Sequence, residues 1–284
     1  MSIMIKGLNT GLLLHEEKFL AVAIKLETDG DKPSLFYMQA TVLKDFLMLL
    51  QNRLVNLSQK EKMGIDEFKL KIENANKEMA AHIPDIQMSD VQQPNLGLRV
   101  VSFSVSPGDE GFNILLSLQN EEMIHIRILD SQLGFILIAV SKTLNNIKDQ
   151  NIVGYFYTGI DFLPLYDILF QPDGSMDYGQ YQFDSWKADI FNNCYLIIFQ
   201  IKNGDSSALL SGGVLKTNVA AGTEELNNIA KSFCALSKKL QQYHPKIINI
   251  YTQPLLIDKK SIPSIGQSLQ PLADFYKSLK KSIS

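Results

Sequence analysis

TVLKDFLMLLQNRLVN, at residues 41–56, predicts an amphipathic helix around which the fold can be built. Its apolar residues follow the i, i+3, i+4, i+7 spacing of one helix face. Ninety residues further on, SQLGFILIAVSKTLNN at residues 131–146 repeats the same spacing without a gap. The two predicted buried stripes are Leu43, Phe46, Leu47, Leu50 and Leu54, and Leu133, Ile136, Leu137, Val140 and Leu144. Thr41 and Ser131 precede the stripes and are predicted as the N-caps of the two helices.

Strand-like segments precede both helices. Residues 19–26 and 34–38 come before the first helix, and residues 98–105, 112–118 and 123–129 come before the second. Apolar alternation and intervening turn residues are typical of half-buried strands in hairpins. We therefore expect two βββα units, each packing its helix on one face of an antiparallel sheet. Duplication explains the match between them, and convergent amphipathic patterning is the alternative explanation for part of it.

A third, looser unit follows. Residues 194–201 and 208–215 predict two strands, and Thr223 is the predicted cap of the next helix. Gly212 and Gly213 interrupt the second of these strands and are interpreted as a glycine bulge.

The end of the chain predicts one more strand and one more helix. The strand is expected at residues 247–251 and the helix at residues 269–279, with Pro271 in its first turn.

Two insertions interrupt this pattern. Residues 58–81 are charged and helix-prone, and residues 151–191, rich in aromatic and turn residues, are expected to form an irregular elaboration. The fold class expected is α+β, with two or three βββα units and these two insertions. The domain organisation expected is a first βββα unit (1–57), a helical insertion with its connector (58–95), a second βββα unit (96–150) and a C-terminal region with the looser third unit (151–284).

The composition is that of an ordinary globular protein. Of the 284 residues, 45% are hydrophobic and 20% are charged, which excludes a disordered or collagen-like chain. Apolar runs are far shorter than the roughly 20 residues that span a bilayer. The first residues carry no basic, apolar secretory leader. Two cysteines are too few for a disulfide framework. We expect a cytoplasmic protein with no membrane partner.

Charge is unevenly distributed along the chain. Residues 216–284 contain ten lysines, no arginine and four acidic residues, although the whole chain carries −3. A basic face for an anionic partner and a solvated lysine-rich surface both fit this asymmetry. The absence of arginine weakens the case for nucleic acid, since bidentate phosphate sites usually recruit it. The candidate contacts are Lys231, Lys238 and Lys239, expected on one face of a single helix, with Lys259, Lys260, Lys277, Lys280 and Lys281.

No catalytic motif is present. Phosphate-binding loops, a nucleophile elbow and a zinc-binding H-E-x-x-H helix are all missing from the sequence. The four histidines, His15, His82, His125 and His244, are scattered, with His125 on the polar face of a strand. Cys194 and Cys234 are flanked by apolar residues and are expected to be buried, inert thiols. No catalytic residue, metal or cofactor is expected.

Several short strings resemble the uncharacterised enterobacterial YjeJ family. They are residues 7–11 (GLNTG), 36–37 (FY), 44–47 (KDFL), 163–166 (LPLY), 180–181 (QY), 186–187 (WK) and 274–276 (DFY). This resemblance spans the chain and implies a bacterial cytoplasmic protein, but it carries no activity with it.

The function expected is non-enzymatic binding or assembly, in which a sheet face or edge is offered to a protein partner or to a second copy of the chain. The first alternative is a single-stranded nucleic-acid binder that stacks bases on Phe36, Tyr37, Phe112, Tyr155, Phe156 and Tyr157. The second is a metal-dependent hydrolase that uses carboxylates between Asp161 and Asp189. These are Asp161, Asp167, Asp173, Asp177, Asp184 and Asp189, with turn and cap roles as the competing interpretation.

Overall fold

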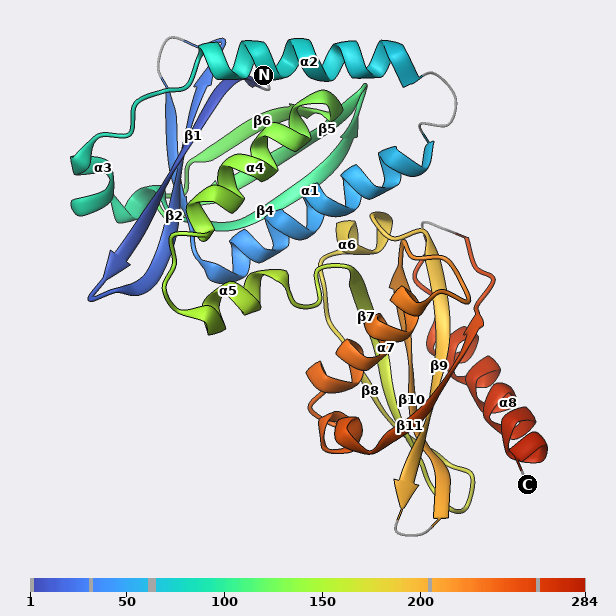
Figure 1. Cartoon of the computed structure of the whole chain (residues 1–284). Coiled ribbons are helices and arrows are strands. Elements are labelled where there is room, and N and C mark those ends of the chain that lie inside the picture. The colour runs from blue at the N-terminus through green and yellow to red at the C-terminus, as the bar shows by residue number, and fades with distance from the viewer. Residues whose placement is uncertain (1–2, 31–32, 61–64, 204–205, 259–260, 284) are drawn as a thin grey trace. The chain divides into compact units, whose positions relative to one another are not determined.

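The computed structural model describes residues 3–30, 33–60, 65–203, 206–258 and 261–283. It confirms an α+β protein, with two sheets in the described residues. The chain divides into two compact units, Met1–Ile160 and Asp161–Ser284, and each contains one of the sheets (Figure 1). No described helix is both long enough and apolar enough to cross a membrane.

The first unit contains a six-stranded sheet in the order β3-β2-β1-β6-β5-β4. All neighbouring strands are antiparallel except β1 and β6, which run parallel and pair only at Ile3↔Ile126 and Met4↔Arg127. The strands are β1 (Ile3–His15), β2 (Lys18–Thr28), β3 (Ser34–Met38), β4 (Val100–Gly108), β5 (Gly111–Leu118) and β6 (Met123–Leu129).

Helices α1 (Ala40–Lys60) and α4 (Leu133–Leu144) bury their apolar stripes against the inner face of this sheet. The predicted stripes are confirmed at eight positions: Leu43, Phe46, Leu47, Leu50, Leu133, Ile136, Val140 and Leu144. Leu54 is 38% exposed and Leu137 is half-buried, so the prediction is wrong at the last turn of the first stripe and too strong at Leu137.

The two predicted N-caps are wrong. Helix α1 already begins at Ala40, and the Leu43 N–H donates to the Gln39 carbonyl oxygen at 2.9 Å. Ser131 lies inside a 3-10 turn, Asp130–Gln132, that precedes α4. The neighbouring Gln132 satisfies the backbone there, since its Oε1 accepts from the Leu129 N–H at 3.1 Å and its Nε2 donates to the Ile5 carbonyl oxygen at 2.8 Å. That long-range partner could not be seen in the local sequence.

The outer face of β1–β3 is covered by residues 82–98, which we call the strap. The strap contains α3 (Met88–Gln92) and the 3-10 turn Leu96–Leu98, and it follows α2 (Ile65–Ala81), the predicted charged helix. A side chain at Gly7 would overlap the His82 carbonyl, and one at Gly11 would press on Ile86 and Val91. Between them Asn9 Nδ2 donates to the Pro84 carbonyl oxygen at 2.8 Å. The strap therefore packs on β1 at the positions where β1 has glycine in place of a larger side chain.

Polar contacts fix the strap to β2 and β3. Lys25 Nζ donates to Asp90 Oδ2 at 2.9 Å, and the Tyr37 hydroxyl donates to the Asp90 carbonyl oxygen at 2.9 Å. Beneath them lies a small apolar cluster of Leu13, Ala21, Ala23 and Tyr37, against which Leu35, Val91 and Leu98 pack.

The second unit contains a five-stranded antiparallel sheet in the order β11-β9-β10-β7-β8. The strands are β7 (Phe162–Phe170), β8 (Met176–Gln180), β9 (Asn193–Asn203), β10 (Ser206–Thr217) and β11 (Ile247–Pro254). The helical elements of the second half of the chain are α5 (Gln150–Tyr157, in the first unit), α6 (Ser185–Asp189), α7 (Glu224–Leu236), the 3-10 helix η3 (Gln241–Lys246) and α8 (Ile265–Ile283).

The irregular elaboration expected at residues 151–191 is wrong. This stretch supplies α5 and the strand β7, which lies inside the sheet between β10 and β8. Pro164 argues against an inner strand because proline cannot donate to a ladder. The structure tolerates it where the β7–β10 register shifts between Val214 and Leu215, with Leu215 opposite Pro164.

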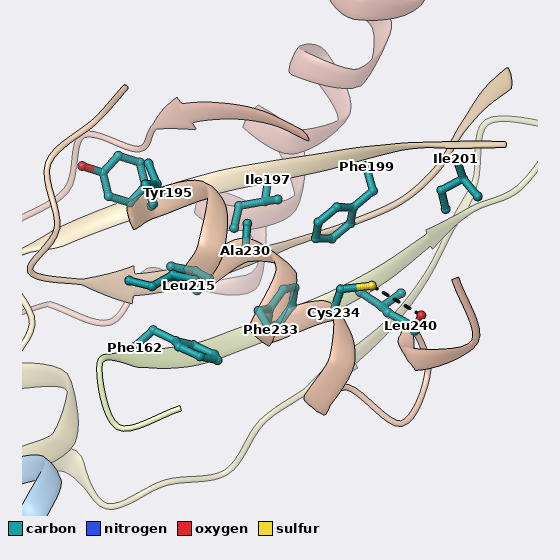
Figure 2. Packing of buried hydrophobic residues seen from close by; sticks show 12 residues of the cluster. Phe162, Tyr195, Ile197, Phe199, Ile201, Leu215, Ala230, Phe233, Cys234 and Leu240 are labelled. Carbon is teal, nitrogen blue, oxygen red and sulfur yellow. Dashed lines mark hydrogen bonds between the residues drawn. The ribbon is translucent and has the colours of Figure 1, made fainter. Parts of the chain in front are cut away.

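Helix α7 packs on one face of this sheet, and the cluster in Figure 2 fills the space between them. Phe233 lies against Gly213, where any side chain would collide with the aromatic ring. Gly213 is thus explained by the close approach of the helix, and a side chain at Gly212 would overlap the Ile197 carbonyl oxygen of β9. The register shifts of β10 lie on either side of the pair, so the bulge expected at the glycines themselves is wrong. Thr223 is confirmed as the cap of α7, because its hydroxyl accepts from the Leu226 N–H at 3.2 Å.

Helix α8 covers the opposite face of the sheet, behind β9 and β10 (Figure 1). It begins at Ile265, so Pro271 lies in its second turn and not in the first as expected. The start is marked by a capping box in which Ser264 and Gln267 each accept from the other's backbone N–H, at 3.3 and 2.9 Å. The sequence carries this Ser-x-x-Gln pattern, which the stripe-based prediction overlooked.

Candidate interaction edge

Four strands form the outer edges of the two sheets, and three of them differ from the fourth in length, charge or proline content. β3 has five residues and meets Arg99 through a bridge at Tyr37. β4 lies against α1, where the rings of Phe103 and Phe46 meet edge to face with centroids 6.5 Å apart. β8 has five residues and carries Asp177, whose carboxylate accepts from Lys239 Nζ at 2.7 Å. Short length and charge are common protections of an edge strand.

Edge strand β11 lacks these protections. Its eight residues, IINIYTQP, contain no charged side chain. The strand pairs with β9 from Ile247↔Ile201 to Pro254↔Tyr195, and no other described strand pairs with its far side. That side presents a row of backbone N–H and C=O groups that an incoming strand could use.

A bulge places an apolar side chain in this edge. The β11–β9 register shifts between Ile247 and Asn249, and the intervening Ile248 is 49% exposed. Pro254 ends the strand without an N–H to donate. The edge therefore offers apolar contact at Ile248, and backbone pairing along it ends at Pro254.

Side-chain hydrogen bonds hold β11 in place from within the sheet. Gln200 of β9 is buried, and its Oε1 accepts from Asn249 Nδ2 at 2.7 Å and from the Tyr251 hydroxyl at 2.9 Å. These bonds add to the backbone ladder, so a partner would meet a preorganised strand.

The predicted anion-contact lysines lie on different elements. Lys231 is exposed on α7, but α7 ends at Leu236, so the expectation that Lys238 and Lys239 share this helix is wrong. Lys239 is paired with Asp177. Lys277, Lys280 and Lys281 are exposed on α8, on the opposite face of the sheet from α7. Lys259 and Lys260 lie outside the described residues. A role of these lysines in anion binding stays a prediction.

Lys216, one of the ten lysines of the basic stretch, is fully buried in β10. Its Nζ donates to the Ala188 carbonyl oxygen at 2.7 Å and to the Ser261 carbonyl oxygen at 3.3 Å. Burial lowers the pKa of this ammonium group. Lys216 therefore joins α6 and the segment before α8 to the sheet and contributes nothing to a basic surface.

The aromatic residues proposed for base stacking are mostly inside the protein. Phe36, Tyr37, Phe112 and Phe156 are each at most 4% exposed, so the expectation that they stack on bases is wrong. Phe36, Tyr37 and Phe112 face apolar layers from strand positions, and sequence alternation does not tell which face will be covered; Phe156 is buried from helix α5. Tyr155 and Tyr157 are partly exposed, but they belong to α5 and not to a sheet.

The carboxylates between Asp161 and Asp189 serve separate local roles. Asp167 is buried and its Oδ2 accepts from the Tyr181 hydroxyl at 2.9 Å and the Ser237 hydroxyl at 2.6 Å. Burial, together with this carboxylate, raises the pKa of Tyr181 to about 12. Asp173 accepts from the Ser175 N–H at 2.9 Å in a turn. Asp184 is the N-cap residue of α6, although its side chain makes no capping bond.

No group of three or more potential ligands lies close enough to hold a metal ion within the described residues. The four histidines are exposed, and His125 is on the polar face of β6 as expected. Cys194 and Cys234 are confirmed as buried thiols, and burial raises the pKa of each to about 12. Such thiols are poor nucleophiles at neutral pH.

Comparisons with known proteins agree with the whole-chain resemblance. A family model described as YjeJ-like matches residues 1–282. The chain is 24% identical over 273 residues to the uncharacterized protein YjeJ of Escherichia coli K12. The aligned region covers 96% of this chain and 94% of that protein. No solved structure matches.

Proposed function

The chain belongs to the YjeJ-like family, and we propose that it is a non-enzymatic binding and assembly protein that accepts an extended segment of a protein partner at edge strand β11. The partner segment would add a sixth strand to the second sheet. Main-chain hydrogen bonds would give the affinity, and side-chain contacts near Ile248 would give selectivity.

One observation carries the proposal, the long and uncharged edge of β11. Natural sheets usually block such an edge with charge, short length or a covering element. β3 and β8 have five residues each, and β4, which has nine uncharged residues, carries Pro107 within the strand, whereas β11 has eight uncharged residues, its proline only at the end, and an exposed Ile248. An edge left open in this way favours pairing with another chain.

The first unit would act as the scaffold in this proposal, and we propose that it is a duplication of one βββα unit. β1, β2, β3 and α1 would form one copy within residues 1–57, and β4, β5, β6 and α4 the other within residues 96–150. The sheet order β3-β2-β1-β6-β5-β4 supports this, because each copy contributes its strands in the same internal order. The ninety-residue offset of the buried stripes supports it as well.

The edge can be tested by adding charges to β11. Ile248→Lys combined with Gln253→Lys places two ammonium groups along β11, and Gln180→Lys on the exposed edge of β8 is the matched control. Cross-linking in the native host identifies a partner segment, which is then titrated as a synthetic peptide. We expect the β11 variant to lose at least about tenfold in affinity, because desolvating an unpaired charge is costly, and the control to be unchanged.

Hydrogen exchange locates the binding independently. Bound peptide should protect the backbone amides of residues 247–253 and leave those of β8 unchanged. Equal affinity of all three proteins, or protection elsewhere, would contradict the proposal.

A further inference from the structure

A groove of about 540 Å³ lies in the first unit, between strand β1, the C-terminal end of α2 and helix α4. This volume lies within the range of small-molecule sites. Its lining comes from residues 8–10 of β1, from positions between 76 and 83, and from positions between 135 and 143 of α4. All of these residues are described, as is every residue within five positions of them along the chain.

The groove follows an edge of β1 that has no strand partner among the described residues. β1 pairs with β2 along one edge, but on the other edge it pairs with β6 only at its first two residues. Side chains satisfy two points further along this second edge. Gln132 Nε2 donates to the Ile5 carbonyl oxygen at 2.8 Å. Thr143 Oγ1 donates to the Thr10 carbonyl oxygen at 3.3 Å.

Leu8 lies between these two points, and its backbone groups are available. In an antiparallel pair, alternate residues direct both backbone groups away from the partner strand. Thr10 directs its carbonyl away from β2, and Leu8, two residues earlier with no bulge between them, does the same. No described group outside β2 bonds to the Leu8 N–H or C=O, although Leu8 is only 3% exposed. Since buried backbone groups are nearly always paired, this donor and acceptor favour a bound partner.

The helical walls of the groove are mainly apolar. Ile83 and Ile138 line it and are 49% and 58% exposed. Phe135 of α4 adds an aromatic ring, and the small Ala80 and Ala139 leave space between the two helices. An aliphatic chain in the groove would remove these apolar side chains from water.

Lys142 supplies the charge in the lining, which contains no acidic side chain. Lys142 is exposed on α4, and its ammonium group has no hydrogen bond or ion pair with any described residue. It follows Thr10 and Thr143 at one end of the groove. An ammonium group in this position favours an anionic ligand group through charge-assisted hydrogen bonds.

We infer that this groove binds a small N-acyl amino acid. Its amide pairs with the backbone N–H and C=O of Leu8, its carboxylate faces Lys142, and its acyl chain lies on Phe135 and Ile138. Leu8 and Thr10 are about 7 Å apart along the strand, a separation that one acylated amino acid and the flexible lysine side chain can span.

The inference does not depend on edge strand β11, since no residue of the second unit lines the groove. Either proposal can fail while the other holds.

N-octanoylglycine is the probe, used below its micelle concentration. Two controls each lack one recognition group: N-octanoylsarcosine has no amide hydrogen, and N-octanoylglycinamide has no charge. Isothermal titration of the full chain should show saturable binding of the probe with a Kd below about 1 mM. The sarcosine compound should bind about fivefold more weakly, and the glycinamide about tenfold more weakly.

Three variants separate the parts of the site. Lys142→Glu should weaken N-octanoylglycine about tenfold or more and leave N-octanoylglycinamide unchanged. Lys69→Glu, at an exposed position of α2 outside the lining, is the matched control and should bind the probe normally. Ala80→Trp, also at an exposed position of α2, should abolish binding of all three compounds by filling the groove.

Amide hydrogen exchange tests the backbone contact directly. In the free chain the Leu8 amide should exchange faster than the Asn9 amide, which is directed toward β2. Saturation with N-octanoylglycine should slow exchange at Leu8 by about tenfold or more, because the bound amide carbonyl accepts from its N–H.

Circular dichroism establishes that each variant is folded. Equal affinity for N-octanoylglycine and N-octanoylsarcosine, unchanged binding in Lys142→Glu, unchanged exchange at Leu8, or no saturable binding of the probe up to about 1 mM would each overturn the inference. If Ala80→Trp is misfolded, Lys142→Glu and the exchange at Leu8 still decide the outcome.

Discussion

The two halves of the six-stranded sheet share an inner core but differ on their outer faces. On β1–β3 the strap buries Leu13, Ala23 and Tyr37. On β4–β6 the outer face is exposed, with Ser104 and His125 on either side of Leu115 in one cross-strand row. The same order of strands and helix therefore supports a covered face in one half and an open face in the other.

The outward-facing residues of β1 and β4 explain why one outer face is covered and the other is exposed. β1 places Gly7, Asn9 and Gly11 at alternate positions, which leaves room for the strap and one amide to bind it. β4 places Ser102, Ser104 and Ser106 at alternate positions, all of them exposed. Both strands therefore carry small outward-facing residues. Only the strand with glycine at alternate positions, β1, is covered by a connecting segment.

The largest effect is expected where the halves are alike. Leu43→Ala and Leu133→Ala each remove a fully buried side chain from the common core. Each should lower the free energy of unfolding by about 2–5 kcal/mol, through lost burial and a cavity. Urea denaturation measures both. A small loss of unfolding free energy at one site and a large loss at the other would contradict the view that the two stripes play equivalent parts in the core.

The next effect compares the outer faces by adding one methyl group to each. Gly7→Ala should destabilise by about 1–3 kcal/mol, because the new Cβ overlaps the His82 carbonyl. Ser104→Thr on the open face should change stability by less than about 0.5 kcal/mol. Thermal unfolding of the two variants gives the comparison. Similar values at both sites would mean that the strap is not docked on β1.

A smaller loss should follow when the strap is released from β2. Asp90→Asn removes the ion pair with Lys25 and should cost about 1–2 kcal/mol. Hydrogen exchange should accelerate in residues 82–98 and remain unchanged in β4–β6. Uniform acceleration over the first unit would show that the strap unfolds only together with the sheet.

The smallest effect is a dependence of the strap on acid. The hydrogen bond from Lys25, with a second from the Gln87 N–H, lowers the pKa of Asp90 below its usual 3.8. This stabilisation is complete above the unfolded-state pKa and is lost as the pH falls through the lower folded-state value. Nuclear magnetic resonance should therefore show the strap loosening only below about pH 4, and Asp90→Asn should abolish that dependence. Loosening near neutral pH would assign the effect to another group.

Local periodicity predicted much of the fold. The stripes at Leu43 and Leu133, the cap at Thr223 and the strand at residues 123–129 depend on neighbours within one element, and the structure confirms them. β7 was missed because Pro164 disfavours an inner strand until a register shift in β10 is known. The strap was missed because its partner, β1, lies about 75 residues earlier in the chain.

The candidate sites were less accessible to sequence reasoning. Whether a strand is an open edge depends on which strands pair with it. The residues IINIYTQP do not reveal that β9 is the only described strand that pairs with β11. The lysine pattern was visible in the sequence, but burial of Lys216 and the early end of α7 required the structure.

The parallel pairing of β1 with β6 has a consequence for synthesis on the ribosome. β1 is among the first segments to emerge, but its partner strand follows about 120 residues later. At roughly 5–20 residues per second, this delay lasts on the order of ten seconds. From the emergence of α1, which ends at Lys60, the β1–β2–β3 hairpins and α1 are present without the second half of their core. The nascent chain therefore exposes apolar surface that a chaperone could cover, and the core of the first unit can be completed only after α4, which ends at Leu144, has left the exit tunnel.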